Sequence, residues 1–320
     1  MLSALKNANS ILLCTHVSPD GDAIGSLLYA GAILRTMGKQ VTMSCSDLVP
    51  ARYMFLEAAD QICLPEALNG RSFDLAFSLD AGDLNRIGAC AEAYLKAPVT
   101  IQLDHHGTNP AYAMYNEIDF EAAATACIVY RMMLALGIKL TEKMAEYLYT
   151  AVSSDTGNFA FQNTDAEAFY VMAACMEAGL PLAVLSRRLN LVREKEHVAL
   201  LGRALNTLHF FAGGHATGMR LTREDYAACA ARPEHSDKIV NYGLDMDDVL
   251  ITYFADDREE GKTKFSLRAQ PPCSVGALAV SLGGGGHEAA AGCTLALPID
   301  EACAVVEEKI TQEIEKRMNG

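Results

Sequence analysis

The sequence lacks several features that would assign the chain to a common class. Its ten cysteines include no Cys-x-x-Cys pair, which argues against a zinc ribbon or a thioredoxin-type redox site. No run of 18 uncharged apolar residues occurs, so no transmembrane helix is expected. The apolar run near the N-terminus is too short for the core of a signal peptide. Because free thiols in this number suit a reducing compartment, we expect a cytoplasmic protein.

Basic residues are also scarce. Lys and Arg number 26 against 40 Asp and Glu, which gives a net charge of −14. Because phosphate neutralisation by Lys and Arg dominates affinity for long nucleic acids, this charge argues against a protein that binds long duplex DNA or RNA. A small anionic substrate in a local basic pocket is compatible with it. Hydrophobic residues make up 51% of the 320 residues, enough for sizeable cores, and the length favours two domains.

Short continuous apolar runs alternate with longer helical patterns in the first half of the chain. Continuous rather than alternating apolar strands favour a parallel sheet covered by helices on both faces. In such α/β folds, ligands bind outside the carboxyl ends of the strands. Strands are expected at 11–14, 41–45, 75–79 and 99–103, and helices at 23–37, 87–94, 122–136 and 143–152.

The pattern changes near residue 186. Residues 187–206 carry basic side chains among leucines and are expected to form an amphipathic linking helix. The stretch "HFFAGGHATGMRL" then predicts a hairpin with glycines in its turn. Further strands are expected at 249–254 and 263–268, and helices at 275–281 and 301–317. We therefore predict an α/β domain over 1–186, a linker over 187–205 and a smaller α/β domain over 206–320.

Carboxylates follow two of the predicted strands. His16, Asp20 and Asp22 follow the first strand in "THVSPDGDA", and Asp80 ends the third. Imidazole and carboxylate groups are ligands of divalent cations, and a two-metal site needs several carboxylates, at least one of them bridging. An alternative role for Asp22 is to cap the helix that begins near Ala23.

Asp104, His105 and His106 stand in tandem directly after the fourth predicted strand. Neighbouring side chains of an extended segment point in opposite directions, so the two histidines are expected to have different roles, one as a metal ligand and one facing substrate. Asp104 is then expected to hydrogen-bond the second ring nitrogen of a ligand. Asp155, in "SSDTG", is a weak signal alone because Asp is common in turns, but it adds a fourth acid to the series.

A run of four glycines stands in "LGGGGHEAAAG", which begins at Leu282. Consecutive glycines let backbone amides approach an anion closely, and His287 adds a side-chain donor, so the run favours a phosphate site over a flexible loop. Arg268, on the preceding predicted strand, is a candidate second phosphate contact. Phe159 and Phe161 are candidates for base stacking, with core packing as the alternative for at least one of them.

These motifs together resemble a known family. "HVSPDGDAIGS", Asp80, Asp104-His105-His106 and "SSDTG" resemble the DHH phosphoesterase superfamily, and "GGGGHEAAAG" is similar to the signature of its DHHA1 substrate-binding domain. The resemblance covers nearly the whole chain in the usual order. It implies a parallel-sheet DHH domain joined by a helical linker to a smaller α/β DHHA1 domain. The stand-alone NrnA-like subfamily fits best, because RecJ exonucleases carry an OB domain and family II pyrophosphatases lack the "GGGGH" signature.

The resemblance also implies site roles and two Mn²⁺ ions, for which Mg²⁺ or Co²⁺ are substitutes. One ion would be held by His16, Asp20 and Asp80, and the other by Asp22, Asp80, His105 and Asp155. A metal-bound hydroxide would attack phosphorus, with Asp80, Asp104 and His106 as the catalytic residues and His106 facing the scissile phosphate. The substrate contacts would be Arg86, Asn109, Arg268, Gly284, Gly285, Gly286 and His287.

The implied activity is hydrolysis of very short oligonucleotides (nanoRNA and linear dinucleotides) and of 3′-phosphoadenosine 5′-phosphate. A cyclic dinucleotide phosphodiesterase is the alternative within the superfamily. A non-catalytic nucleotide sensor is the alternative outside enzymes, and it is disfavoured because no expected ligand position is missing. The expected partners are short oligonucleotides or nucleotide phosphates, without long duplex DNA or a membrane, and a homodimer is compatible with the sequence.

Overall fold

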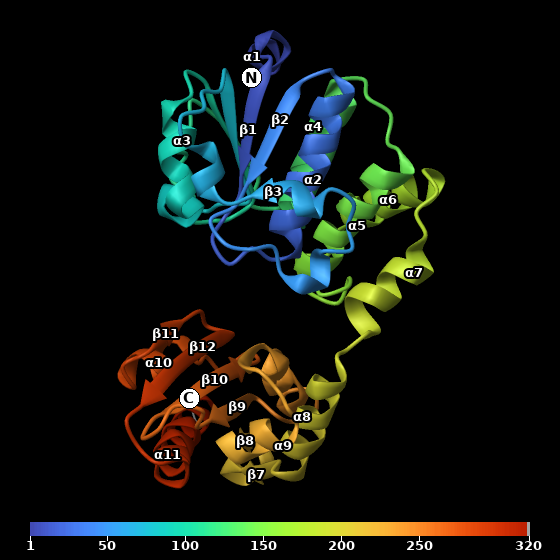
Figure 1. Ribbon diagram of the computed structural model, residues 1–320. Helices are drawn as coiled ribbons and strands as arrows, with labels where there is room; N and C mark the ends of the chain where they lie inside the picture. Colours follow the sequence, from blue (N-terminus) through green and yellow to red (C-terminus); the bar gives the residue numbers. More distant parts are fainter. Residues whose placement is uncertain (319–320) are drawn as a thin grey trace. The chain divides into compact units, whose positions relative to one another are not determined.

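A computed structural model describes residues 1–318, and the chain divides into two units, 1–192 and 193–320 (Figure 1). The first unit is built on a six-stranded sheet in which every pair of neighbouring strands is parallel, in the order β3-β2-β1-β4-β5-β6. The predicted parallel sheet is therefore confirmed. Its strands are β1 (Ser10–Cys14), β2 (Gln40–Ser44), β3 (Ile62–Cys63), β4 (Leu75–Leu79), β5 (Thr100–Asp104) and β6 (Tyr115–Ile118).

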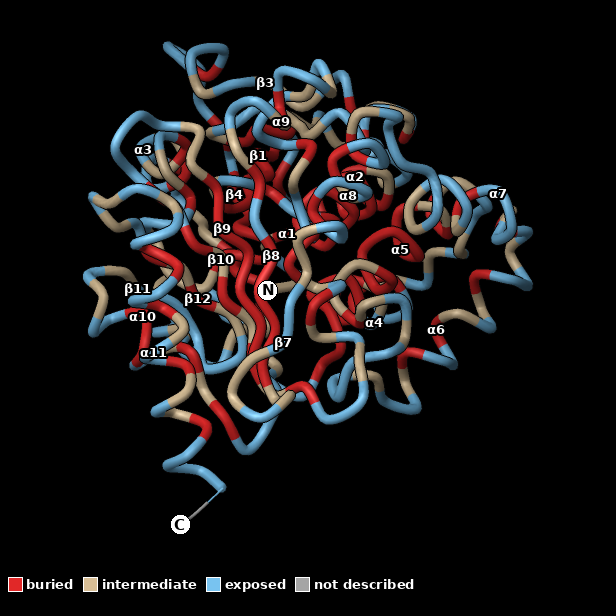
Figure 2. The backbone as a smooth tube through the Cα atoms, turned by 90° about the horizontal axis from the view of Figure 1, so that it is seen from below, coloured by how far each residue is buried: buried red, intermediate tan, exposed pale blue. Residues whose placement is uncertain are grey.

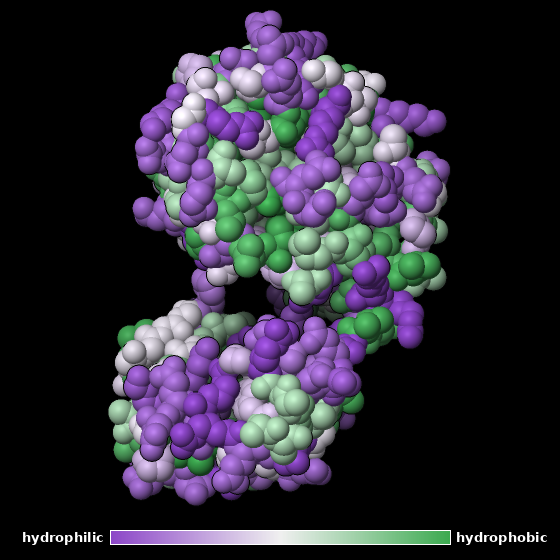
Figure 3. Space-filling view, viewed as in Figure 1, coloured by the Kyte–Doolittle hydropathy of each residue, from purple (hydrophilic) through white to green (hydrophobic). Residues whose placement is uncertain are grey.

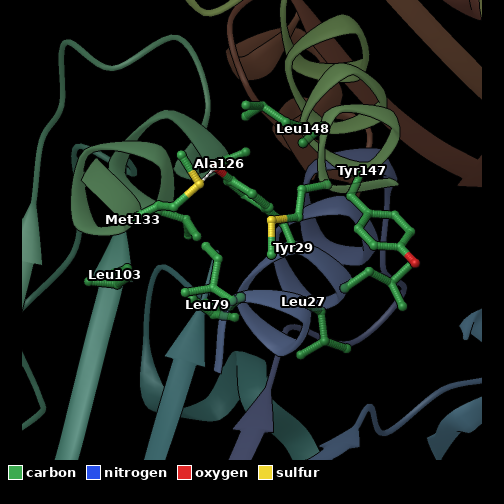
Figure 4. Packing of buried hydrophobic residues seen from close by; sticks show 14 of the residues in the cluster. Leu27, Tyr29, Leu79, Leu103, Ala126, Met133, Tyr147 and Leu148 are labelled. Carbon is green, nitrogen blue, oxygen red and sulfur yellow. Dashed lines mark hydrogen bonds between the residues drawn. The ribbon is translucent and has the colours of Figure 1, made fainter. Parts of the chain in front are cut away.

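Helices cover both faces of this sheet, as predicted. On one face, Leu79 of β4 and Leu103 of β5 pack against Leu27, Met133 and Leu148, which come from three different helices (Figure 4). These helices are α2 (Gly21–Thr36), α4 (Thr125–Ala135) and α5 (Glu142–Asp155). A smaller cluster on the other face packs β1 and β4 against η4 (Leu84–Cys90) and α3 (Ala91–Lys96). Figure 2 shows the central strands buried and most exposed positions on the surrounding segments.

Further short helices complete the first unit. They are α1 (Leu2–Asn7), η1 (Ala51–Tyr53), η2 (Ala59–Gln61), η3 (Pro65–Leu68), α6 (Ala166–Glu177), α7 (Leu182–Ser186) and the π-helix η5 (Arg187–Leu191). No helix within the described residues is long and apolar enough to cross a bilayer.

A glycine on α2 allows two helices to approach closely. A Cβ atom at Gly25 would lie 2.7 Å from the carbonyl oxygen of Tyr147 and 2.8 Å from the Cβ of Ala151, both on α5. Only a residue without a side chain fits there. This contact places Asp22, near the start of α2, beside Asp155, the last residue of α5.

The chain first adds β2 and β3 on one side of β1 and then adds β4, β5 and β6 on the other side. The order of the strands in the sheet therefore changes direction between β1 and β4. At such a switch point the connections leave toward opposite sides and open a crevice at the carboxyl edge of the sheet. His16 follows β1 and Asp80 follows β4, so both lie at this crevice, and Asp104 ends the next strand, β5. The fold therefore collects the polar motifs at one edge.

The second unit contains a mixed sheet in the order β11-β12-β10-β9-β8-β7, with only β8 and β9 parallel. The predicted hairpin is confirmed as β7 and β8, which pair antiparallel around η6 (Ala212–Gly214). The strands are β7 (His209–Phe211), β8 (Ala216–Leu221), β9 (Ile251–Asp256), β10 (Thr263–Ala269), β11 (Gly285–Gly286) and β12 (Ala290–Leu295).

Two sets of helices flank this sheet. α10 (Gly276–Ser281) and α11 (Ile299–Met318) pack into the core formed by β9, β10 and β12. The outer side of α11 is hydrophilic (Figure 3). On the other face, a second cluster includes residues of α8 (Lys195–Asn206), α9 (Arg223–Ala228) and η8 (Ile239–Gly243), and η7 (Pro233–Ser236) lies beside them.

Two predicted helices differ in the structure. The helix expected at 87–94 is a 3-10 helix that breaks at Gly88, where φ is +63°, and continues as α3. The single helix expected at 187–206 is interrupted at Val192 and Glu194, which are extended. The apolar face before this break packs on the core of the first unit through Leu185, whereas Leu200 of α8 packs on the second. Since tertiary burial supplies most helix stability, two different cores support two separate helices.

Candidate metal centre

Two groups of candidate ligands meet at Asp80. Nε2 of His16 lies 3.8 Å from a carboxylate oxygen of Asp20 and 3.6 Å from one of Asp80. Asp80 has a left-handed backbone with φ of +58°, a conformation that Asp tolerates better than most residues and that turns the chain at the end of β4. The first group therefore joins the loop after β1 to the end of β4.

The second group surrounds His105. Its Nε2 lies 3.0 Å from Asp155, 3.6 Å from Asp80 and 4.0 Å from Asp22, measured to carboxylate oxygens. Donor atoms of Asp22, His105 and Asp155 all lie within 4.8 Å of one another, as do those of His16, Asp20 and Asp80. The structure thus brings together all six residues that the sequence suggested as metal ligands.

Backbone carbonyls set the orientation of both imidazoles. Nδ1 of His16 lies 2.7 Å from the carbonyl oxygen of Val17, and Nδ1 of His105 lies 3.0 Å from that of Ala122. An N–H at Nδ1 donates to each carbonyl, which directs Nε2 at the carboxylates, where its neutral form can ligate a cation. Imidazole nitrogen and carboxylate oxygen suit a borderline divalent cation such as Mn²⁺, so this donor set fits a two-metal centre.

The charges of the site repel one another in a way that a cation relieves. Burial, reinforced by Asp80, raises the pKa of Asp22 well above its usual range, and burial likewise raises the pKa of Asp155 to about 6. Burial disfavours the charged imidazoles, but the surrounding carboxylates outweigh it and raise the pKa of His16 and of His105 to about 10. A bound cation would stabilise the ionised carboxylates and take the place of the imidazole protons.

These pKa shifts predict that metal binding releases protons. With pKa values near 10, both imidazoles are protonated at pH 7 in the metal-free protein, and ligation requires the neutral form. We expect Mn²⁺ affinity to rise between pH 6 and pH 8, with about two protons released per protein. Calorimetric titration in buffers of different ionisation enthalpy measures this number. Proton release near zero across that range would contradict the prediction.

Thr125, at the start of α4, supports the ligands and was not predicted. Its amide donates to Asp22 at 2.6 Å and its hydroxyl donates to Asp80 at 2.9 Å, while Ser26 donates to Asp22 at 2.8 Å. The cap of α2 is Asp20, which accepts from the amides of Asp22 and Ala23. The cap role considered for Asp22 was therefore wrong for α2, because its carboxylate instead accepts amides at the start of α4.

Replacing Thr125 by valine is expected to weaken metal affinity about 10- to 100-fold, because the hydroxyl that orients the shared Asp80 is lost at nearly constant volume. Thr125→Ser keeps the hydroxyl and should restore most of the affinity. Calorimetric Mn²⁺ titration of both variants measures the difference. Equal affinities for the two variants would show that the hydroxyl has no role in positioning Asp80.

Asp104 forms its hydrogen bond with His106 and not with His105. Nδ1 of His106 lies 2.8 Å from the buried Asp104 carboxylate, which raises the pKa of His106. The structure thus differs from the expectation that Asp104 would bond a metal-ligating imidazole, since His105 is held by a carbonyl. Asn109 was expected to contact substrate, but its amide nitrogen donates to Asp104 and its oxygen accepts from the amide of Ala111. Asn109 therefore positions Asp104.

Two other suggested residues lie near the centre. The exposed Arg86 has a guanidinium nitrogen 3.1 Å from Nδ1 of His16, so its charge is close to the first group of ligands. Phe161 is 59% exposed and covers Gly157, two residues after Asp155. Phe159 stacks on Phe169 with a centroid separation of 5.6 Å and packs against the core, which is the core-packing alternative.

The glycine run in the second unit packs backbone against backbone. A Cβ atom at Gly284 would lie 2.1 Å from the carbonyl oxygen of Gly292, and one at Gly286, where φ is +144°, would lie 2.5 Å from the Cα of Ala291. The amide of Gly284 donates to Ala279 at the end of α10, so it is not directed at an anion. The amide of Gly284 is therefore not available to an anion cradle, and only Gly285 and Gly286 of the run form the edge strand β11.

Three suggested contacts in this unit stay accessible. Gly285 and His287 are exposed on and beside β11. Arg268, on β10, is partly buried, and burial lowers its pKa. Its guanidinium donates to the carbonyl of Leu267 at 2.9 Å, and within residues 1–318 no carboxylate lies within ion-pair distance of it. A partly buried guanidinium without a counter-ion is a suitable anion contact.

Comparison with known proteins gives one consistent result. Residues 10–152 match the DHH family N-terminal domain and residues 226–316 match the DHHA1 domain. The chain is 34% identical over 307 residues to the bifunctional oligoribonuclease and PAP phosphatase NrnA of Thermus thermophilus, covering 95% of this chain and 90% of that protein. It is 22% identical to the probable NrnA of Streptococcus mutans over 59% of each chain.

A solved structure shares the fold over nearly the whole length. An exopolyphosphatase-related protein from Bacteroides fragilis superposes with a TM-score of 0.89 at 23% identity and covers 97% of this chain and 94% of that one. The matched domains, the order of the motifs and the full-length similarity agree with one another. The chain therefore belongs to the DHH family, with a DHH domain followed by a DHHA1 domain.

Proposed function

We propose that the protein is a Mn²⁺-dependent phosphoesterase that hydrolyses very short oligonucleotides, linear dinucleotides and 3′-phosphoadenosine 5′-phosphate in the cytoplasm. The observation that carries the proposal is the pair of ligand groups meeting at Asp80, with His106 beside them. The full-length similarity to a protein named as a bifunctional oligoribonuclease and PAP phosphatase supports the choice of substrates.

Six residues would hold the metals: His16, Asp20 and Asp80 in one group, and Asp22, His105 and Asp155 with Asp80 in the other. Two Mn²⁺ ions, or Mg²⁺ or Co²⁺ in their place, would supply Lewis acidity toward a phosphoryl oxygen and lower the pKa of water. Thr125 and Ser26 hold the carboxylates in place.

His106 is the residue that we assign to the phosphate. It donates from Nδ1 to Asp104, is 42% exposed at its side chain, and its ring lies 5.1 Å from that of His105. Asp104 raises the pKa of His106, which favours the cationic form as a donor to a phosphoryl oxygen on which negative charge develops. Asp104 is a positioning residue in this scheme, and Asn109 holds Asp104.

In the second unit we assign Arg268 to a substrate phosphate distant from the scissile one. The exposed Gly285 lies on the edge strand β11, which β12 separates from β10, and His287 directly follows β11. Both are further candidate contacts. A few local cations suffice for a substrate of two to five nucleotides, which is consistent with a net charge of −14. The proposal includes no membrane and no long duplex, and it allows a homodimer.

The test is a panel of Mn²⁺-dependent hydrolysis reactions with product analysis. Its substrates are labelled oligonucleotides of two to seven nucleotides, 3′-phosphoadenosine 5′-phosphate and cyclic dinucleotides. We expect turnover of the shortest linear substrates and of the bisphosphonucleotide. Hydrolysis of cyclic dinucleotides alone would favour the cyclic dinucleotide phosphodiesterase instead. No turnover of any substrate would exclude the proposed activity.

A further inference from the structure

A groove in the second unit follows the face of β10 that is turned away from α11. Phe265 and Leu267 of β10 belong to the core beneath the sheet, and Lys264, Ser266 and Arg268 alternate with them on the opposite face. Two cavities of about 250 Å³ each lie over this face. Both are lined by the same four residues, so they adjoin: Pro233, Asp256, Arg258 and Lys264.

The acids that line this groove are paired with cations or stand at its rim. Asp256 accepts from the hydroxyl of Tyr226 at 2.9 Å and lies 2.6 Å from Arg258. Glu259 pairs with Lys262 at 3.1 Å. Glu234 is likewise paired, with Arg232 at 3.1 Å, and Asp237 is exposed.

The positive charge that no carboxylate neutralises therefore lies on the outward-facing residues of β10, Lys264, Ser266 and Arg268, here called the β10 row. Among the residues that the structure describes, neither Lys264 nor Arg268 has a carboxylate within ion-pair distance. Lys238, on the segment opposite, lines the same cavity as Arg268. The hydroxyl of Ser266 lies between the two cations of the row and adds a donor. Positive side chains at regular spacing in an otherwise acidic chain form a local anion-binding track.

Small residues continue the floor of the groove across the sheet. Ser266 is opposite Gly292, which in turn is opposite Gly285 on the edge strand, and Arg268 is opposite Ala290. Open space surrounds the position that a Cβ atom of Gly285 would occupy. Directly opposed residues of antiparallel strands project to the same face. A polymer backbone can thus approach this part of the sheet closely beside the cations.

We propose that the β10 row of Lys264, Ser266 and Arg268 binds successive phosphates of oligonucleotides longer than two nucleotides. At about 3.3 Å per residue, Lys264 and Arg268 are separated by about 13 Å along the strand, more than one nucleotide of an extended single strand. We assign the phosphate of a dinucleotide to Arg268, the contact proposed above, and the further phosphates of a longer substrate to Ser266 and Lys264. This inference rests on the proposed function and assigns the groove to the longer of its substrates.

The test compares Lys264→Ala with Lys309→Ala. Lys309 is exposed on α11, on the other face of the sheet, and loses the same charge. Binding of labelled two-mers and five-mers to the full chain is measured in EDTA, so that no hydrolysis occurs. We expect Lys264→Ala to weaken five-mer binding about three- to tenfold and to reduce the slope of log affinity against log salt by about 0.7, with the two-mer unchanged.

The Lys309→Ala variant should bind both lengths like the wild type. Equal weakening of both lengths by Lys264→Ala, no weakening of five-mer binding, or wild-type affinity that does not rise with length would each overturn the inference. Lys264→Glu serves as a second variant and should weaken five-mer binding further. The wild type could hydrolyse no substrate while Lys264→Ala still weakens five-mer binding and leaves two-mer binding unchanged. That result would contradict the proposed function but support the groove as a binding site for longer oligonucleotides.

Discussion

Replacing Asp80 by asparagine is expected to reduce the rate of dinucleotide hydrolysis by about a thousandfold or more. Asp80 lies between both ligand groups, 3.6 Å from Nε2 of His16 and 3.6 Å from Nε2 of His105, so its loss affects both metals. Asparagine is the appropriate substitution because φ is +58° at this position, and Asn tolerates the left-handed conformation as Asp does. The rate is measured under saturating Mn²⁺, with metal content determined in parallel.

The fold should survive this change. The carboxylate of Asp80 repels Asp22 and attracts the protonated imidazoles of His16 and His105. A neutral amide removes both the repulsion and the attraction, so the metal-free variant should unfold at a temperature close to that of the wild type. Asp60→Asn, at an exposed site on η2, is the control and should leave activity unchanged. Unchanged nucleotide binding in Asp80→Asn, together with no activity in the wild type, would support the sensor alternative.

Replacing His106 by alanine is expected to lower kcat about 100- to 1000-fold while Mn²⁺ affinity stays close to that of the wild type. The imidazole donates to a developing charge in this scheme, although its donor atom lies close enough to Asp80 and His105 to share a metal with them. His105→Ala gives the opposite pattern, because His105 lies 3.0 Å from Asp155 and is a ligand. Single-turnover rates and calorimetric metal titration separate the two effects. Loss of metal from His106→Ala would make it a ligand instead.

Asp104→Asn tests whether Asp104 acts through His106. We expect a smaller loss of kcat, about 10- to 100-fold, and a lower pKa for His106 in the pH–rate profile, since the carboxylate hydrogen bond that raises it is removed. In the double variant the losses should not multiply, because Asp104 has no partner to position once His106 is gone. Full multiplication would indicate an independent role for Asp104.

The sequence was informative about the first unit because its central strands, β1, β4 and β5, are buried on both faces. Continuous apolar runs identified β1, β2, β4 and β5, and the polar residues directly after them had to lie at one sheet edge. That rule predicts from the sequence that His16, Asp80 and Asp104 lie together at this edge. The helix boundaries were less predictable, since the break at 192–194 depends on which of two cores each apolar face joins.

The contacts that hold the metal ligands in place could not be predicted from the sequence. Thr125 is 103 residues from Asp22 along the chain, and an ordinary threonine at a helix start gives no sign of its distant partners. The pairing of Asp104 with His106 rather than His105 depends on the carbonyl of Ala122, which is already bound to His105. The glycine run resembled an anion cradle, whereas close packing against the backbone of β12 explains Gly284 and Gly286.

The sequence by itself determined the set of chemical groups, the parallel sheet that collects them and the family to which the chain belongs. All three can be recognised from local patterns, because a strand buried on both faces requires a continuous run of apolar residues and each motif is a short stretch of sequence. Only the tertiary structure decided which carboxylate serves which histidine, that Asn109 supports Asp104, and that Lys264, Ser266 and Arg268 line an open groove. Those are properties of distances between segments far apart in the chain, and long-range packing alone sets them.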